Sequence, residues 1–252
     1  MMITNDFIGA QSESQVCSAC PIRDQAICSR CEVDELTLLE KIKTYRSFQK
    51  GSMITITGSP MTHVGTLVSG VASVSQGMED GRRQILGILL PSDFVGRPGG
   101  RHAQYDIIAA TDVLMCRFET TAFESLLNSS PTLGPRLLEM TMDELDAARE
   151  WMLLLGRKTA REKIASLIYM IGLKAKALSK KSNQNDFEFT LPLTRETLSD
   201  YIGLTTETVS RQITALRNDR IIFTKGQRQF IIPDFLRLLE ETGDDYSGDI
   251  IS

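Results

Sequence analysis

The sequence has few of the features that mark exported, membrane-bound or catalytic proteins. Among 252 residues there are only two histidines, and no apolar run approaches the ~18 residues that a membrane-spanning helix needs. The first residues, Met1–Asp6, have neither the basic nor the apolar stretch of a secretory signal. We therefore expect a cytoplasmic protein with no membrane partner. No His/Asp/Ser constellation is apparent and no thioredoxin-like pattern surrounds the cysteines, so an enzyme is not expected.

Charge is unevenly distributed along the chain. The 28 Lys and Arg and 32 Asp and Glu residues give a net charge of −4, which alone argues weakly against nucleic-acid binding. However, residues 1–155 carry −6, residues 156–232 carry +7 and residues 233–252 carry −5. A basic segment of this kind is an electrostatic footprint for a polyanion, although a solvated helix face is the alternative interpretation.

The N-terminal half of the chain has first a helical and then a strand pattern. Leu36, Leu39 and Ile42 recur at helical spacing and predict a short amphipathic helix over residues 34–46. From about 47 to 118, short runs of Val, Ile, Thr and Phe are separated by glycines. This spacing predicts a compact antiparallel barrel or jelly roll, with a hairpin turn at Asp80-Gly81.

A long helix is predicted over residues 132–155. Its apolar residues recur at coiled-coil-like spacing, in the order Leu138, Met142, Leu145, Met152 and Leu155. One interpretation is that this helix packs against its own barrel and nothing else. The acidic and basic residues beside the apolar seam favour a helix that pairs with a second copy of itself. Another helix is expected from Arg157 to about Lys176, followed by a polar loop over Lys180–Asp186.

The basic segment contains the pattern of a winged helix-turn-helix. Thr194 and Thr205 are suitable N-caps for two helices, and Gly203 supplies the turn between them. After the second helix, over about 206–218, two short apolar runs around Lys225-Gly226 predict the hairpin called the wing. Two packed helices without DNA contacts remain the alternative.

The second of these helices has two distinct faces. One is an apolar stripe made by Val209, Ile213 and Leu216. The other is polar and lies toward the helix N-terminus, where recognition helices meet base edges. The candidate DNA-binding residues are Thr206, Glu207, Ser210, Arg211 and Thr214. Arg can donate two hydrogen bonds to guanine and Glu can accept from cytosine.

Four of the five cysteines form the pattern C-x2-C-x7-C-x2-C, made by Cys17, Cys20, Cys28 and Cys31. In a reducing compartment this pattern indicates a metal site rather than disulfides. Both tetrahedral zinc and an iron–sulfur cluster use four thiolates, and spacing alone does not decide between them. Cys116, taken alone, is typical of a buried free cysteine in a strand.

These motifs together resemble the FNR branch of the cAMP-receptor/FNR superfamily of bacterial transcription regulators, and are similar to its FnrL-type oxygen regulators of alphaproteobacteria. The resemblance runs from residue 15 to about 240. It rests on the cysteine run and on three further stretches, Leu89–Gly96, Leu137–Ile171 and Glu207–Arg211, the last of which matches the E-x-x-S-R recognition motif.

The resemblance implies an α+β fold: an N-terminal β-roll like that of cyclic-nucleotide-binding proteins, a long dimerisation helix and a C-terminal winged helix-turn-helix. The implied divisions are a cluster-binding segment (1–33), a β-roll sensor domain (34–130), a dimerisation helix (131–157), a DNA-binding domain (158–240) and a disordered acidic tail (241–252). The dimerisation residues would be Leu138, Met142, Leu145 and Met152.

The resemblance further implies a [4Fe-4S] cluster held by Cys17, Cys20, Cys28 and a fourth cysteine in the barrel, which corresponds to Cys116. The chain departs from the family pattern by its seven-residue spacing and by Cys31, the alternative fourth ligand. A cluster that reached Cys116 would pin the N-terminal loop to the barrel, whereas one completed by Cys31 would be only local. A zinc-stabilised or cluster-free regulator that responds to another signal is the alternative function.

The same resemblance implies an oxygen-responsive homodimer that would bind sites like TTGAT-N4-ATCAA at low oxygen and would contact RNA polymerase. Arg211 would read the guanine, Glu207 its paired cytosine and Ser210 a neighbouring thymine. No cyclic nucleotide is expected, because Arg97 replaces the family glutamate and His102–Tyr105 lacks the Arg-Ser or Arg-Thr pair.

Overall fold

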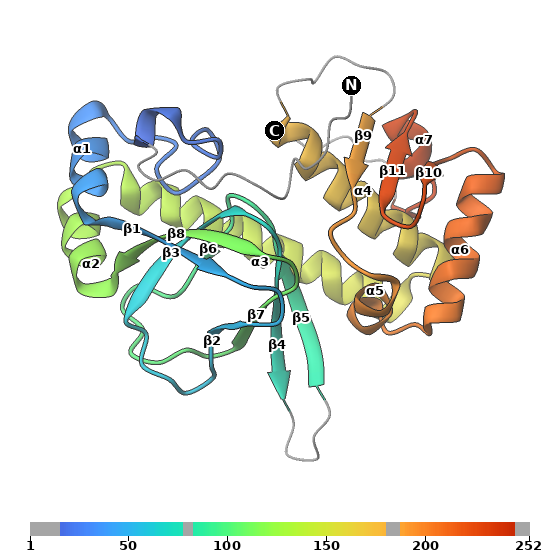
Figure 1. The fold of residues 1–252 in the computed structure, drawn as a ribbon, viewed down its shortest axis with the longest axis horizontal. Helices are drawn as coiled ribbons and strands as arrows, with labels where there is room; N and C mark the ends of the chain where they lie inside the picture. The colour runs from blue at the N-terminus through green and yellow to red at the C-terminus, as the bar shows by residue number, and fades with distance from the viewer. Residues whose placement is uncertain (1–15, 78–82, 180–186, 245–252) are drawn as a thin grey trace. The chain divides into compact units, whose positions relative to one another are not determined.

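The computed structural model describes residues 16–77, 83–179 and 187–244 (Figure 1). The chain divides into two compact units, Met1–Ala148 and Arg149–Ser252. The boundary lies within one long helix, α3 (Leu133–Arg157). Within the described ranges, no helix is both long and apolar enough to cross a bilayer.

The first unit contains two four-stranded antiparallel sheets, with strand orders β1-β8-β3-β6 and β2-β7-β4-β5. The strands are β1 (Lys43–Phe48), β2 (Met53–Thr55), β3 (His63–Ser69), β4 (Ala72–Gly77), β5 (Arg83–Leu89), β6 (Phe94–Val95), β7 (Asp106–Ala109) and β8 (Val113–Glu119). Phe48, Leu67 and Met115 from the first sheet form one buried cluster with Leu89 and Ile107 from the second. The expected β-roll is therefore confirmed.

The helix that we expected over residues 34–46 is shorter than predicted. Helix α1 spans Val33–Ile42 and begins with a capping box between Glu32 and Glu35. Residues from Lys43 onward form β1, which pairs antiparallel with β8. The residues Thr44, Tyr45 and Phe48 favour strands, and the backbone of β8 offers them a ladder of hydrogen bonds. The Asp80-Gly81 turn lies outside the described residues, but the strands that it would join, β4 and β5, do pair antiparallel.

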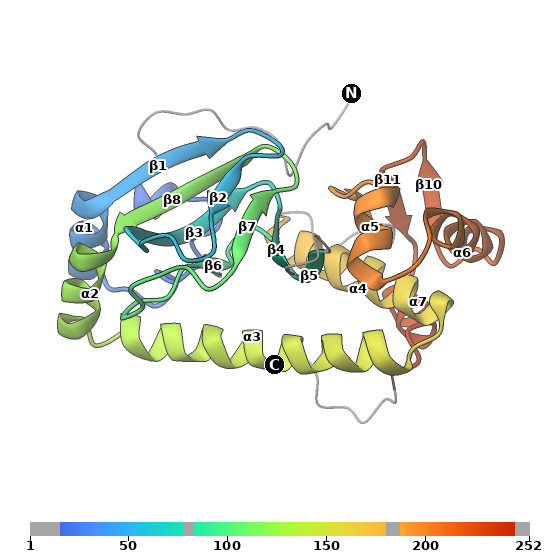
Figure 2. The ribbon, with the colours of Figure 1, turned by 90° about the horizontal axis from the view of Figure 1, so that it is seen from below.

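A second apolar cluster joins the N-terminal segment to the helices of the first unit. It includes Ile27, Leu39 on α1, Phe123 on α2 (Thr120–Ser129) and Leu133 at the start of α3. Figure 2 shows α1 and α2 at one end of the strands, with α3 beginning beside α2. Helix α2 was not expected from the sequence. Helix α3 confirms the predicted long helix to within two residues at either end.

The second unit is a winged helix-turn-helix, as predicted. Its elements are α4 (Ala160–Leu178), β9 (Phe187–Thr190), α5 (Arg195–Ile202), α6 (Thr206–Asn218), β10 (Phe223–Lys225), β11 (Gln229–Ile232) and α7 (Phe235–Glu240). Strands β10 and β11 form the wing, and β9 adds a third strand in the order β10-β11-β9. Strand β9 and helix α7 were not expected. The predicted polar loop over residues 180–186 lies outside the described residues.

The structure places the start of the expected tail, residues 241–252, against the second unit. Glu241 accepts a hydrogen bond from Nε of Arg161 at 2.6 Å, and Asp244 forms an ion pair with Lys158 at 2.6 Å. Thr242 is buried. Residues 241–244 are therefore part of the fold, because their charges meet basic residues on and beside α4, while residues 245–252 lie outside the described part of the chain.

Candidate DNA-binding face and cysteine pocket

The helix-turn-helix is fixed by local hydrogen bonds at its two N-caps. The hydroxyl of Thr194 accepts from the backbone N–H of Thr197, and the hydroxyl of Thr205 accepts from that of Thr208, both at 3.1 Å. Between the two helices, Gly203 adopts a left-handed backbone with φ of 65°, which few residues other than glycine tolerate. These contacts set the direction of α6 relative to α5.

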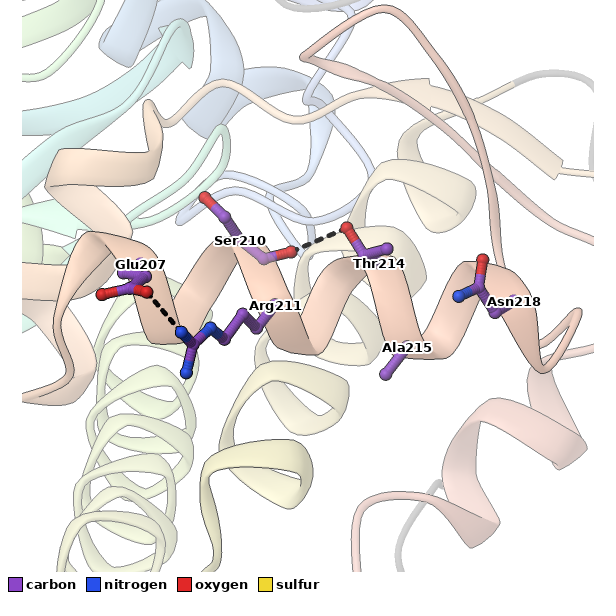
Figure 3. Close-up of a pocket in the computed structure, with 6 residues that line it drawn as sticks. All are labelled: Glu207, Ser210, Arg211, Thr214, Ala215 and Asn218. Carbon is purple, nitrogen blue, oxygen red and sulfur yellow. Dashed lines mark hydrogen bonds and ion pairs between the residues drawn. The ribbon is translucent and has the colours of Figure 1, made fainter.

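Helix α6 separates its apolar and polar faces as the sequence predicts. Val209, Ile213 and Leu216 are buried against the rest of the unit. The opposite side is open and lined by six residues, which we call the polar face of α6: Glu207, Ser210, Arg211, Thr214, Ala215 and Asn218 (Figure 3). Four of these were predicted as DNA-binding residues. Ala215 and Asn218 were not, although they continue the same face at helical spacing.

Glu207 and Arg211 form an ion pair on this polar face. They lie one helical turn apart, with 2.5 Å between Arg211 Nη2 and Glu207 Oε1, and both side chains are about three-quarters exposed. The hydroxyl of Thr214 donates to the Ser210 carbonyl of the same helix at 2.9 Å. Exposed polar groups held in one row can meet the edges of bases in a major groove.

Thr206, the fifth predicted DNA-binding residue, does not line the polar face. Its hydroxyl lies 3.2 Å from the hydroxyl of Ser199 on α5. This contact joins the two helices at the turn.

At the tip of the wing, the left-handed Gly226 (φ 69°) is flanked by the exposed Lys225 and Arg228. Lys225 also pairs with Glu188 on β9 at 2.9 Å.

Four cysteines from distant parts of the sequence line one pocket. Cys17, Cys20 and Cys28 come from the N-terminal segment, and Cys116 comes from β8. We call this the cysteine pocket; its other lining residues are Ile22, Ala26, Ile27, Leu39, Tyr45, Thr66 and Phe118. Burial, with the neighbouring thiols adding to it, raises the pKa of Cys116 to about 12. Burial also raises the pKa of Cys28 to about 11.

Cys31 does not line the cysteine pocket. It is buried, and its sulfur lies 3.7 Å from the hydroxyl oxygen of Thr132 just before α3. The same hydroxyl donates to the carboxylate of Glu35 at 2.7 Å, and Ser130 donates to that carboxylate as well. The structure therefore gives Cys31 a place in the contact between α1 and the start of α3.

Two observations bear on whether the cysteine pocket fits a metal centre. Within the described ranges, no group of three or more His, Cys, Asp or Glu side chains is close enough as placed to hold a metal ion. The grouping of the four thiols therefore rests on a shared pocket and not on coordination geometry. Thr66 also lines this pocket, and its buried hydroxyl has no hydrogen-bond partner in the described part of the chain. An orphaned buried donor beside four thiols is compatible with a bound group that accepts hydrogen bonds.

Sequence patterns missed two polar residues of the cysteine pocket and one beside it. Tyr45 and Thr66 lie opposite Cys116 on the two strands that flank β8. Lys43 donates to the sulfur of Cys17 at 3.4 Å and pairs with Glu40 at 3.2 Å. These three residues could have been predicted only from the register of β1 and β3 against β8, and that register cannot be read from the sequence.

The apolar seam of α3 is exposed in the single chain. The exposed fractions are 63% for Leu138, 48% for Met142, 43% for Leu145 and 66% for Met152. An unpartnered apolar row of this kind is unusual on a monomer.

The three positions that bear on cyclic-nucleotide binding are also exposed. Arg97, His102 and Tyr105 all lie on the surface of the β-roll. Gly96 adopts φ of 107°, and a side chain there would collide with Val64. This turn therefore requires glycine for reasons of space and backbone geometry alone.

Comparison with known proteins identifies both units. Residues 45–130 match the family described as a cyclic nucleotide-binding domain, and residues 162–241 match the Crp-like helix-turn-helix domain. The chain is 56% identical to the transcriptional activator protein FnrL of Cereibacter sphaeroides, over 92% of this chain and 94% of that protein. It is 35% identical to the nitrogen fixation regulation protein FixK of Bradyrhizobium diazoefficiens, over 86% and 90%.

Among solved structures, FixK2 from Bradyrhizobium japonicum superposes with a TM-score of 0.72 at 29% identity, covering 81% of this chain and 99% of that one. These relatives are regulators rather than enzymes, in agreement with the polar face of α6 and with the lack of a catalytic constellation in the sequence. The chain is therefore a member of the CRP/FNR family of DNA-binding transcription regulators.

Proposed function

We propose that this protein is a cytoplasmic, oxygen-responsive transcription activator whose DNA binding depends on a [4Fe-4S] cluster. The observation that carries the proposal is the cysteine pocket, in which three N-terminal thiols share one space with Cys116 of β8. When bound, the cluster supplies an oxygen-labile group held by thiolates. Cys17, Cys20, Cys28 and Cys116 would hold it.

The choice of Cys116 over Cys31 as fourth ligand is supported by their surroundings. Cys116 shares the pocket with the three N-terminal thiols. Cys31 instead faces the hydroxyl of Thr132. A ligand set that includes Cys116 ties the N-terminal segment to the β-roll, so the presence of the bound group can alter how that segment packs.

We further propose that the active form is a homodimer paired through the exposed seam of α3. Each fully buried Leu or Met side chain stabilises an interface by roughly 1.5–3 kcal/mol. A symmetric pair of these chains would present two α6 helices to DNA, which fits a near-palindromic operator of the TTGAT-N4-ATCAA type.

The ion pair between Glu207 and Arg211 supports the proposed reading of one G·C pair in this operator. The ends of the two side chains meet at 2.5 Å, and a G·C pair presents guanine acceptors beside a cytosine donor in the major groove. Arg211 would donate to guanine, Glu207 would accept from cytosine, and Ser210 would contact the neighbouring thymine. RNA polymerase is the expected protein partner, and no cyclic nucleotide is expected at the exposed Arg97.

The test is anaerobic purification followed by iron analysis and operator binding before and after exposure to air. The proposal predicts a brown protein with about four irons per chain, as the thiolate-held cubane requires, and binding that weakens in air. A colourless protein with one zinc, or binding indifferent to air, would instead support the zinc-stabilised or cluster-free alternative.

A further inference from the structure

The cysteine segment, residues 17–31, is closed on itself by one arginine. Arg23 donates from its two Nη atoms to the carbonyl oxygens of Cys28 and Cys31, the second at 3.0 Å. These bonds fix the turn that carries the last cysteines of the run. They do not reach any residue of α3.

A second arginine fastens the same segment to α3. Arg136, on the first turn of α3, donates from Nη2 to the carbonyl of Gln25 at 2.7 Å and from Nε toward the carbonyl of Ala26 at 3.5 Å. Its Nη1 pairs with Glu139 at 2.6 Å, and the other oxygen of Glu139 pairs with Arg30 at 2.6 Å. The segment is therefore held to α3 at two places, through its backbone and through Arg30.

Apolar packing follows the same path. Ile27 and Cys28 of the segment belong to one cluster with Leu133, Leu137 and Met140 of α3. The exposed seam begins directly beside this cluster, at Leu138. A change in how the cysteine segment packs therefore also changes the packing of the turns of α3 where the seam starts.

The position of Arg136 is not explained by the needs of α3 alone. A positive charge in the first turn of a helix opposes the helix dipole and is mildly destabilising. Arg136 is also largely covered, with 16% of its side chain exposed. Covering an arginine at this end of a helix is stabilising only because backbone carbonyls of the cysteine segment and Glu139 satisfy its donors.

We propose that Arg136 is a positioning residue that couples the state of the cysteine segment to dimerisation through α3. This inference rests on the proposed function, and it assigns the coupling to one side chain. With Arg136 in place, an ordered segment holds the first turns of α3 in the orientation that presents Leu138, Met142 and Leu145. Without Arg136, the cysteine pocket still forms, but the orientation of the seam no longer depends on the state of the cysteine segment.

The experiment measures the dimerisation constant of the full chain by sedimentation velocity, with cluster-loaded and iron-free protein side by side. The variants are Arg136→Ala and Glu139→Gln, which removes the charge that pairs with Arg30 and leaves the carbonyl bonds of Arg136. Arg157→Ala is the matched control, since it removes an arginine from the same helix about 30 Å along its axis. Iron per chain and hydrogen exchange at residues 133–142 are recorded for each protein.

For Arg136→Ala we expect unchanged iron, an unchanged iron-free constant and a loaded dimer weakened about tenfold, within the usual range of coupling between sites. Loading should slow hydrogen exchange at residues 133–142 in the wild type and in Arg157→Ala but not in Arg136→Ala. Glu139→Gln should show the same pattern with a smaller loss, about threefold.

Three results would overturn the inference while leaving the proposed function standing. These are equal weakening of the loaded and iron-free dimers, no weakening of either, and loss of iron by Arg136→Ala while Glu139→Gln behaves as the wild type. If instead the wild type binds no iron or dimerises equally with and without it, the proposed function itself fails, and the inference with it.

Discussion

Cys116 on β8 lies opposite Tyr45 on β1 in the antiparallel register, and both side chains line the cysteine pocket. On its other side, Cys116 lies opposite Thr66 of β3. Gly65 allows β3 to lie this close to β8, because a Cβ at that position would come within 2.2 Å of the Cys116 carbonyl oxygen. Since a one-residue slip of a strand reverses its faces, the pairing of three strands determines that Cys116 meets the N-terminal cysteines.

Thr66→Val should stabilise the iron-free protein by about 1 kcal/mol, because it replaces a buried hydroxyl that has no hydrogen-bond partner among the described residues with a methyl group of similar size. Urea denaturation of the iron-free chain measures the effect. Thr120→Val is the matched control. The hydroxyl of Thr120 donates to the carbonyl of Met61 at 2.7 Å, so its loss should destabilise by about 1 kcal/mol. If Thr66→Val lowers the free energy of unfolding as Thr120→Val does, the hydroxyl of Thr66 has a hydrogen-bond partner.

Glu35→Gln should remove a pH-dependent part of the stability. Burial alone would raise the pKa of Glu35, but hydrogen bonds from Ser130, Thr132 and the N–H of Glu32 hold it below its ordinary value. A depressed folded-state pKa adds stability above the unfolded pKa, and that stability is lost as pH falls through the folded value. Thermal melting from pH ~7 to ~3 should therefore show the gap between wild type and variant narrowing in acid. A difference in melting temperature that stays constant with pH would contradict the lowered pKa of Glu35.

Leu145→Ala should weaken dimerisation of the loaded protein by at least about tenfold, because the symmetric interface loses two apolar side chains. Leu145 is 43% exposed in the single chain, so the fold itself should change little. Leu236→Ala provides the control, since Leu236 is 64% exposed on α7 and is not part of the seam. Sedimentation velocity distinguishes the two. Equal behaviour of both variants would place the dimer contact elsewhere.

Arg211→Ala should cost about 1–3 kcal/mol of operator binding and relax the preference for the G·C pair of TTGAT. The side chain is 75% exposed and bonds only Glu207 among the contacts described, so folding should be preserved. Fluorescence anisotropy with operators altered at each base pair measures both effects. Arg228→Ala at the wing should instead weaken all sequences alike. If Arg211→Ala also weakens them alike, Arg211 does not read a base.

Elements with local signals were predictable from the sequence. The caps Thr194 and Thr205, the turn at Gly203 and the stripe of Val209, Ile213 and Leu216 define the helix-turn-helix within about 25 residues, because capping and periodicity are local properties. The exposed seam of α3 followed from the same kind of periodicity.

Elements that depend on distant partners were not predictable. The sequence predicts a helix through residue 46, but residues from Lys43 onward form a strand because β8 pairs with them. Strand β9 similarly depends on β11. The choice between Cys31 and Cys116 stayed open for the same reason, since only the register of β8 brings Cys116 to the N-terminal thiols.

The most direct test of the proposed ligand set compares iron per chain in Cys116→Ser and Cys31→Ser, both purified without oxygen beside the wild type. If Cys116 is the fourth ligand, the wild type and Cys31→Ser should hold about four irons, as a thiolate-held cubane contains, and Cys116→Ser should lose both iron and operator binding. Full iron in Cys116→Ser with loss in Cys31→Ser would contradict this ligand set, because the cluster would then be held by the N-terminal segment alone.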